Sequence, residues 1–150
     1  MNKDLRTFLA EVRQLGPDYF ATVSRTVDPL FEPCVIQQKL AAEGRFPVIR
    51  CEKVNGSELP LATNLFGSYA LLGLALGVDP GEPKRAILER FREREANPLP
   101  TIEVARADAP VKQVVIEGKD VDLAKLPIVH HAEKDSGKYI TVGCLVVRDP

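Results

Sequence analysis

The sequence predicts a mixed α/β (α+β) fold, and three observations support this fold class. Apolar residues recur with helical spacing in several stretches, short β-prone runs lie between those stretches, and no internal repeat is present. Interleaved helices and strands are typical of a sheet that packs against helices. The chain of 150 residues is also long enough to bury a hydrophobic core without disulfides.

The predicted helices follow from apolar positions spaced three and four residues apart. They cover residues 5–15, 33–44, 65–76 and 83–97. Asn64 is the expected N-cap of the third helix, because Asn side chains accept hydrogen bonds from free N–H groups there. Gly77 is the expected end of that helix, and its buried stripe is expected to include Tyr69 and Leu72. The narrow apolar stripe of the fourth helix consists of Ile87, Leu88 and Phe91.

The predicted strands cover residues 19–23, 47–54, 59–63, 111–117 and 140–147. Asn55-Gly56 is a strong short signal for a hairpin and joins the second strand to the third. Arg50, Glu52 and Lys53 are interpreted as the solvent-facing side of the second strand. The last strand is nearly continuous in apolar residues, which is typical of a strand covered on both faces of its sheet.

Composition and charge exclude several classes of function. Hydrophobic residues make up 45% and charged residues 27% of the chain, as in ordinary globular proteins. The net charge of −1 lacks the basic surplus that is typical of nucleic-acid binders. No apolar stretch is long enough to span a bilayer, and the N-terminus does not resemble a signal peptide. Three widely spaced cysteines are interpreted as reduced, buried side chains of a cytoplasmic protein: Cys34, Cys51 and Cys144.

Common catalytic and nucleotide-binding motifs are absent. The sequence contains no GxGxxG, no P-loop and no GxSxG. His130 and His131 are the only histidines, with Glu133 and Asp135 close behind them. Neighbouring side chains of an extended segment point to opposite sides, so this pair is a poor metal chelator. We therefore expect a solvent-exposed loop here and no metal site.

Thr141 and Gly143 share one face of the last predicted strand. A glycine in the middle of a strand often marks the close approach of a ligand or of another backbone. Thr141 offers a hydroxyl beside it. Two interpretations stay open from these residues: a binding surface, or packing alone.

Six segments occur in a fixed order along most of the chain. They are residues 4–9, 46–57, 59–68, 74–78, 121–128 and 139–143, with the last leading into Arg148-Asp149-Pro150. Taken together, in this order and at these spacings, they resemble the N-terminal part of the UbiD-like decarboxylases, which use prenylated flavin mononucleotide (prenylated FMN).

The resemblance implies two domains. Residues 1–109 would form an N-terminal α/β domain, and residues 110–150 the first strands of an incomplete split β-barrel that binds the flavin. The family reversibly and non-oxidatively decarboxylates aromatic or α,β-unsaturated carboxylic acids. Its members use Mn²⁺ beside the flavin, receive the flavin from a flavin prenyltransferase and are expected to form homo-oligomers.

Only Thr141 matches a family position close to the flavin, so it is the single cofactor-binding candidate. The family's catalytic and metal-binding residues lie downstream of the last segment, so no catalytic or metal ligand is assigned here. The chain is then expected to be inactive alone, as a fragment or as a subunit completed by another chain. The alternatives are a non-catalytic scaffold subunit of a UbiD-like complex and, with less support, a regulatory domain that binds a small molecule.

Overall fold

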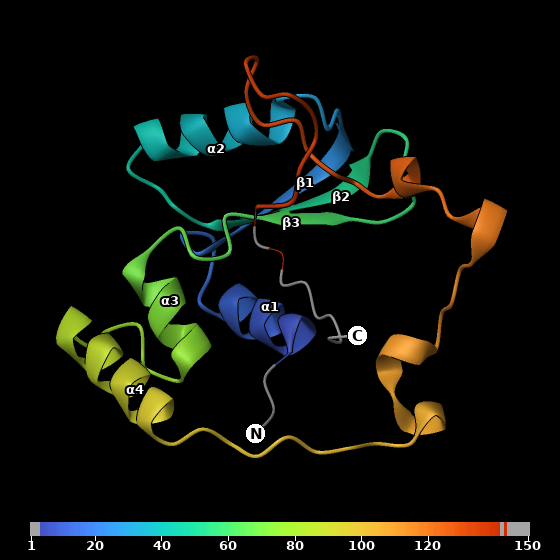
Figure 1. The fold of residues 1–150 in the computed structure, drawn as a ribbon. Helices are drawn as coiled ribbons and strands as arrows, with labels where there is room; N and C mark the ends of the chain where they lie inside the picture. The colour runs from blue at the N-terminus through green and yellow to red at the C-terminus, as the bar shows by residue number, and fades with distance from the viewer. Residues whose placement is uncertain (1–3, 142, 144–150) are drawn as a thin grey trace.

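The computed structural model describes residues 4–141 and 143, and it shows a mixed α/β fold (Figure 1). Its helices and strands are α1 (Leu5–Gln14), β1 (Phe20–Val27), α2 (Glu32–Ala42), β2 (Val48–Val54), β3 (Leu61–Thr63), α3 (Tyr69–Leu76) and α4 (Lys84–Ala96). Short 3-10 turns follow at Arg106–Asp108, Pro110–Lys112, Gly118–Asp120 and Leu123–Lys125. The fold class predicted from the sequence is therefore confirmed.

The sheet has the strand order β1-β2-β3 and combines both kinds of pairing. β1 and β2 are parallel and are joined by α2, whereas β2 and β3 are antiparallel. The predicted turn at Asn55-Gly56 is confirmed, because Ser57 N–H donates to the carbonyl of Val54 at 3.1 Å. Gly56 has a φ of 78°, a backbone conformation that glycine adopts without steric cost.

Helices cover both faces of the sheet, with α1 and α3 on one side and α2 on the other (Figure 1). Val48 and Ile49 are adjacent in β2 and point to opposite faces. Both side chains are fully buried. The cluster on the α1 side consists of Phe8, Val12, Phe20, Val48 and Leu71. The cluster on the α2 side consists of Val27, Ile49, Cys51 and Val54.

The start of α3 differs from the prediction. Asn64 is not its N-cap, because Asn64 adopts a φ of 58° and its Nδ2 donates to the Pro47 carbonyl at 2.8 Å. Ser68 is the N-cap instead, and its hydroxyl accepts from Leu71 N–H at 3.3 Å. The amide of Asn64 thus ties the connection to the start of β2. The predicted end of the helix is confirmed, since Gly77 is a left-handed C-cap.

The buried face of α3 also differs from the prediction. Leu71 is fully buried, whereas Tyr69 and Leu72 are 57% and 37% exposed. The later start leaves α3 only eight residues, and Gly73 on its buried side approaches Ile87 of α4. A Cβ at Gly73 would stand 3.3 Å from the Ile87 side chain. The buried residues of the helix are therefore Leu71, in the cluster on the α1 side of the sheet, and Gly73, against α4.

The predicted stripe of α4 is confirmed at one of its three positions. Ile87 is buried against α3, whereas Leu88 and Phe91 are about half exposed. The reason is that α4 packs on the edge of α3 rather than beneath the sheet (Figure 1). The charged residues of α4 are solvated, as predicted, and form ion pairs along the helix such as Arg85–Glu89.

The predicted strand at residues 111–117 is absent. Val111 and Val114 are 79% and 77% exposed, and the backbone there forms turns or irregular structure. A strand needs a neighbouring strand to pair with its N–H and C=O groups. Figure 1 shows this part of the chain as an arc that stands away from the sheet. β-prone residues without a partner strand therefore stay irregular.

The last predicted strand lies mostly outside the described residues. Of residues 140–147, only Ile140, Thr141 and Gly143 are described, and none of the three is in a strand. Ile140 and Thr141 are exposed. The prediction for the rest of that strand, and for Cys144, falls on residues that the structure does not describe.

Candidate functional site

Thr141 follows a loop formed by residues 129–139, which we call the histidine loop. Thr141 is exposed, and so is Gly143, two residues further along the chain. A Cβ at Gly143 would lie 3.5 Å from the Ile140 side chain, which is an ordinary contact. The described residues therefore give no steric reason for a glycine at this position.

The histidine loop is fixed to the start of α2 by backbone hydrogen bonds. His130 N–H donates to the Pro29 carbonyl at 3.0 Å, and Phe31 N–H donates to the His130 carbonyl at 2.9 Å. Within the loop, Tyr139 N–H donates to the Val129 carbonyl at 3.2 Å. These bonds place the candidate cofactor contact two residues beyond an anchored position.

Both histidines are half-buried, which corrects the prediction of a solvent-exposed loop. The His130 ring packs against Phe31 with a centroid separation of 5.0 Å, and the His131 ring packs against Tyr139 at 4.4 Å. Polar composition alone predicted exposure, whereas the backbone pairing with the α2 entry turns the two rings onto aromatic neighbours. His130 Nε2 also lies 3.2 Å from the Asp135 carbonyl oxygen, whereas His131 Nδ1 is buried without a hydrogen-bond partner among the described residues.

Asp135 organises the turn of the histidine loop. Its Oδ2 accepts from Ala132 N–H at 2.8 Å. Desolvation, and then the charge of Asp135, raise the pKa of the Cys34 thiol and the pKa of the Tyr139 phenol. Both groups are therefore held in their neutral forms at neutral pH, and Cys34 lacks the lowered pKa of a nucleophilic cysteine.

The described residues do not form a metal site. Within residues 4–141 and 143, no three His, Cys, Asp or Glu side chains converge as ligands. The structure does not bring the histidine pair, Glu133 and Asp135 together as a set of ligands.

A flavin site is not assembled by these residues either. Thr141 presents an exposed hydroxyl, but a flavin site needs several groups that converge on the isoalloxazine ring and the phosphate. The described chain offers one such group at this position. Contact between Thr141 and a flavin therefore stays a prediction.

Family models match the chain in two consecutive regions. Residues 18–91 match the N-terminal domain of 3-octaprenyl-4-hydroxybenzoate carboxy-lyase, UbiD. Residues 102–150 match the Rift-related domain of the same carboxy-lyase. The order of the two regions along the chain is the order that the resemblance predicted.

Solved structures of UbiD-class enzymes share the fold. Vanillic acid decarboxylase from Sedimentibacter hydroxybenzoicus, in its open form with one truncated subunit, is 32% identical with a TM-score of 0.82, over 93% of this chain and 30% of that chain. An evolved dimeric form of HmfF from Pelotomaculum thermopropionicum, in complex with prenylated FMN, is 33% identical with a TM-score of 0.78, over 93% and 31%. Another structure of HmfF, in complex with FMN, is 33% identical with a TM-score of 0.76, over 91% and 29%.

This chain is therefore similar to these enzymes in both sequence and structure, over nearly all of its length. The chain spans less than a third of the length of each of these solved structures. Together, the two family regions and the shared fold establish that the chain belongs to the UbiD family and corresponds to its N-terminal region.

Proposed function

We propose that this chain is the N-terminal part of a prenylated-FMN-dependent carboxy-lyase. The substrate would be an aromatic or α,β-unsaturated carboxylic acid, decarboxylated reversibly and without net oxidation. The carbon–carboxylate bond breaks, CO₂ leaves, and a proton takes its place on the carbon. The observation that carries this proposal is the pair of consecutive UbiD regions in one chain.

The flavin is proposed from the relatives. HmfF, at 33% identity, is described in complexes with prenylated FMN and with FMN. The modified flavin supplies the reactive centre for the bond cleavage, and the protein binds and orients the substrate against it. Thr141 is this chain's candidate contact to the flavin. Mn²⁺ is proposed as the accompanying metal, held by residues beyond this segment.

We also propose a domain boundary at residue 109, with an α/β domain at 1–109 and a barrel-forming segment at 110–150. The boundary is supported by the irregular, exposed chain that follows α4. The first family region ends at residue 91 and the second begins at residue 102, which supports a division of the chain after α4, some residues before the proposed boundary. Limited proteolysis is expected to cut first within residues 97–110.

The experiment that tests the activity uses the full-length protein, co-expressed with a flavin prenyltransferase. We expect CO₂ release from at least one acid in a panel of aromatic and α,β-unsaturated acids. The same preparation should incorporate ¹³C-bicarbonate into the product, because the reaction is reversible. Protein made without the prenyltransferase is the control and should be inactive. Absence of turnover with a bound, spectroscopically intact prenylated flavin would reject the proposal.

A scaffold subunit is the second candidate function. The described residues contain no convergent metal ligands, while a long apolar segment after α4 lies exposed. Both features fit a chain completed by a separate UbiD-like subunit. The mass of the polypeptide from its native source separates the two candidates. A mass several-fold above 16.5 kDa favours the enzyme, and a mass of 16.5 kDa favours the subunit.

Cellular placement and assembly complete the proposal. Within the described residues, no helix has the length and apolar character needed to cross a membrane. We propose a cytoplasmic enzyme that assembles as a homo-oligomer, and one HmfF relative is described as an evolved dimer. Light scattering of the full-length protein measures the assembly state directly.

A further inference from the structure

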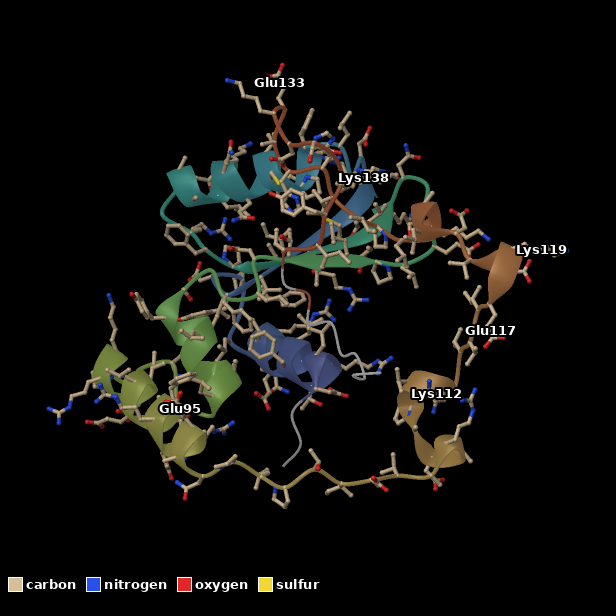
Figure 2. All side chains as sticks on the ribbon, in the orientation of Figure 1. Glu95, Lys112, Glu117, Lys119, Glu133 and Lys138 are labelled. Carbon is tan, nitrogen blue, oxygen red and sulfur yellow. The ribbon has the colours of Figure 1, made fainter. Side chains whose placement is uncertain are left out.

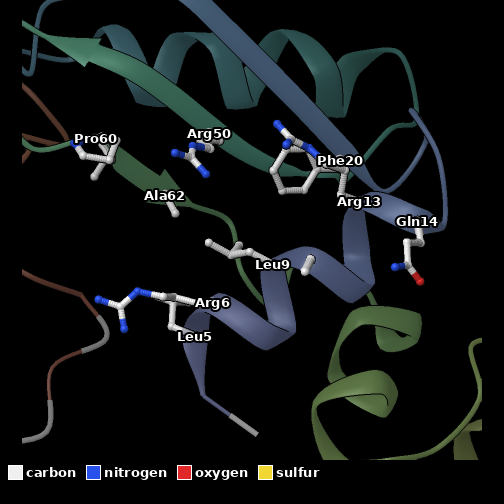
Figure 3. Close-up of a pocket in the computed structure, with 11 residues that line it drawn as sticks. Leu5, Arg6, Leu9, Arg13, Gln14, Phe20, Arg50, Pro60 and Ala62 are labelled. Atoms are coloured by element: carbon white, nitrogen blue, oxygen red, sulfur yellow. The ribbon is translucent and has the colours of Figure 1, made fainter. Parts of the chain in front are cut away.

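A pocket of about 740 Å³ lies between α1 and the face of the sheet formed by β2 and β3 (Figure 3). Its size is within the range of roughly 300–1,000 Å³ that is typical of small-molecule sites. Most of the lining residues are apolar. These apolar residues come from α1, β1, β3 and the loop before β3. The apolar lining residues include Leu5, Leu9, Phe20, Pro60, Leu61 and Ala62.

The charged groups that line this pocket are all guanidinium groups. Arg6 and Arg13 come from α1, and Arg50 comes from β2. No Asp or Glu is among the lining residues, and none of the three arginines forms an ion pair with a described residue. The net charge of the whole chain is −1, so this concentration of positive charge is local to the pocket.

Arg50 was interpreted from the sequence as solvent-facing, and the structure corrects this. Alternation along β2 puts Arg50 on the same face as the buried Val48, which is the face that α1 covers. Arg50 is half-buried, and its Nε is sealed from solvent without a hydrogen-bond partner. A buried N–H donor without an acceptor is unfavourable. A bound anion would supply the missing acceptor.

Arg13 is held in place by an aromatic side chain. Its guanidinium lies over the Phe20 ring, 5.0 Å from the ring centroid. Figure 3 shows Arg13 and Arg50 on the Phe20 side of the pocket, with Leu9 on the opposite wall. Arg6 lies at the far end and interacts with Asp4, whose pKa it helps to lower. Arg13 and Arg50 are therefore the two guanidiniums that lie on the same side of the pocket.

We propose that this pocket binds a small organic carboxylate with an apolar body. The carboxylate would accept hydrogen bonds from Arg50 and Arg13, since guanidinium groups match carboxylate geometry. The apolar body would cover Leu9 and Leu61, which line the pocket and are partly buried. Inorganic phosphate would satisfy the charge but leave this apolar wall in water. This inference stands on the pocket alone and does not depend on the proposed decarboxylation.

Calorimetric titration of the 150-residue chain with 3-phenylpropanoate tests the site. This acid is saturated, so it is not of the class that the proposed enzyme would decarboxylate. We expect one saturable site per chain. The neutral 3-phenylpropanamide and acetate should each bind at least about tenfold more weakly than 3-phenylpropanoate. Absence of saturable binding, or equal binding of acid and amide, would overturn the proposal.

Matched arginine variants locate the binding. Arg50→Gln and Arg13→Gln should each weaken 3-phenylpropanoate binding by about tenfold or more, because each removes a charged hydrogen bond. Arg92→Gln, at an exposed position on α4, makes the same charge change outside the pocket and should bind as the unsubstituted chain does. Arg13 is exposed, so Arg13→Gln should leave the fold intact and still tests the site if Arg50→Gln impairs folding. Unchanged affinity in Arg13→Gln and in a folded Arg50→Gln would place the ligand elsewhere and reject the site.

Discussion

Leu71 lies at the centre of the contact between α3 and the sheet. It is fully buried in the same cluster as Phe8 and Val48, whereas its neighbour Leu72 is 37% exposed. Leu71→Ala is expected to lower the free energy of unfolding by about 2–5 kcal/mol, through lost burial and the cavity left behind. Leu72→Ala makes the same chemical change and should cost about 1 kcal/mol or less. Urea unfolding measures both. Equal losses would contradict this placement of the helix.

The thiols of Cys34 and Cys51 are expected to react slowly in the folded chain. Desolvation raises the pKa of both above the ordinary value of 9.0, so at a given pH less of each is the reactive thiolate. Cys51 is also fully buried, so it should be alkylated by iodoacetamide more slowly than Cys34. Peptide mass spectrometry reads the two sites separately. Alkylation of Cys51 in the folded chain at the rate seen in urea would contradict its burial.

Asp4, at the start of α1, is expected to make the free energy of unfolding depend on pH in the acid range. Its carboxylate accepts from Thr7 N–H and from the Thr7 hydroxyl, both at 2.7 Å, and these bonds lower its pKa from the ordinary value of 3.8. A lowered folded-state pKa means that the contribution is present above the unfolded-state pKa and is lost as the pH falls through the folded-state value.

The measurement compares urea midpoints of the original chain and Asp4→Ala at about pH 6 and about pH 3. The urea midpoint of Asp4→Ala should lie below that of the original chain, and by more at about pH 6 than at about pH 3. Asp4→Asn is the matched control, because Asn is an equally good N-cap without the titrating charge. Its difference from Asp4→Ala should not depend on pH. A pH-independent difference between Asp4→Ala and the original chain would contradict the role of the carboxylate.

At the scale of elements, local signals predicted α1, α2, α4 and β2 with bounds close to those observed. Their periodicity and their limiting Gly and Pro residues lie within each segment, so the sequence window contains the information. The start of α3 and the strand at 111–117 depend on contacts with distant residues. The Asn64 amide bonds the Pro47 carbonyl, and Val111 has no partner strand. Neither the hydrogen bond nor the lack of a partner strand can be predicted from the residues that lie nearby in the sequence.

The candidate sites show the same division. The pattern of Thr141 and Gly143 left a binding surface and packing open, and only the resemblance related Thr141 to a flavin, because one hydroxyl in an apolar run does not indicate a particular ligand. Arg50 was missed because alternation shows which residues share a face of a strand but not which face a helix covers. The stacking of the Arg13 guanidinium on the Phe20 ring could not be predicted either, because it joins α1 to a strand that lies outside the helix's own sequence window.

Asn64 tests how the connection between β3 and α3 is held. Asn64→Ala removes the 2.8 Å hydrogen bond to Pro47 and puts an alanine at a φ of 58°, so a loss of roughly 1–3 kcal/mol is expected. Asn64→Gly removes the same bond but accepts the positive φ, so it should lose less. Thermal unfolding of both variants gives the comparison. Greater stability of Asn64→Ala than of Asn64→Gly would show that this backbone conformation is not retained.

At the scale of the whole molecule, the chain divides into a folded part and an exposed apolar segment. Large apolar side chains lie exposed from Leu99 to Leu126, and the described chain offers them no covering surface. Figure 2 shows Lys112 and Glu117 on the part of this segment that lies away from α1, α3 and α4. Exposed apolar surface on this scale is typical of a segment that is covered by further protein.

Hydrogen exchange tests this division in full. In the 150-residue chain, backbone amides of residues 99–126 should exchange rapidly, because most lack hydrogen bonds within regular structure. In the full-length protein the same amides should become protected, since barrel strands would pair them. The amides of β2 are the internal control and should be protected in both, because β2 lies between two strands. Protection of residues 99–126 equal to that of β2 in the short chain would mean that the segment folds by itself. Rapid exchange in the full-length protein would mean instead that further chain does not cover it, and the proposed barrel would then have to form without these residues.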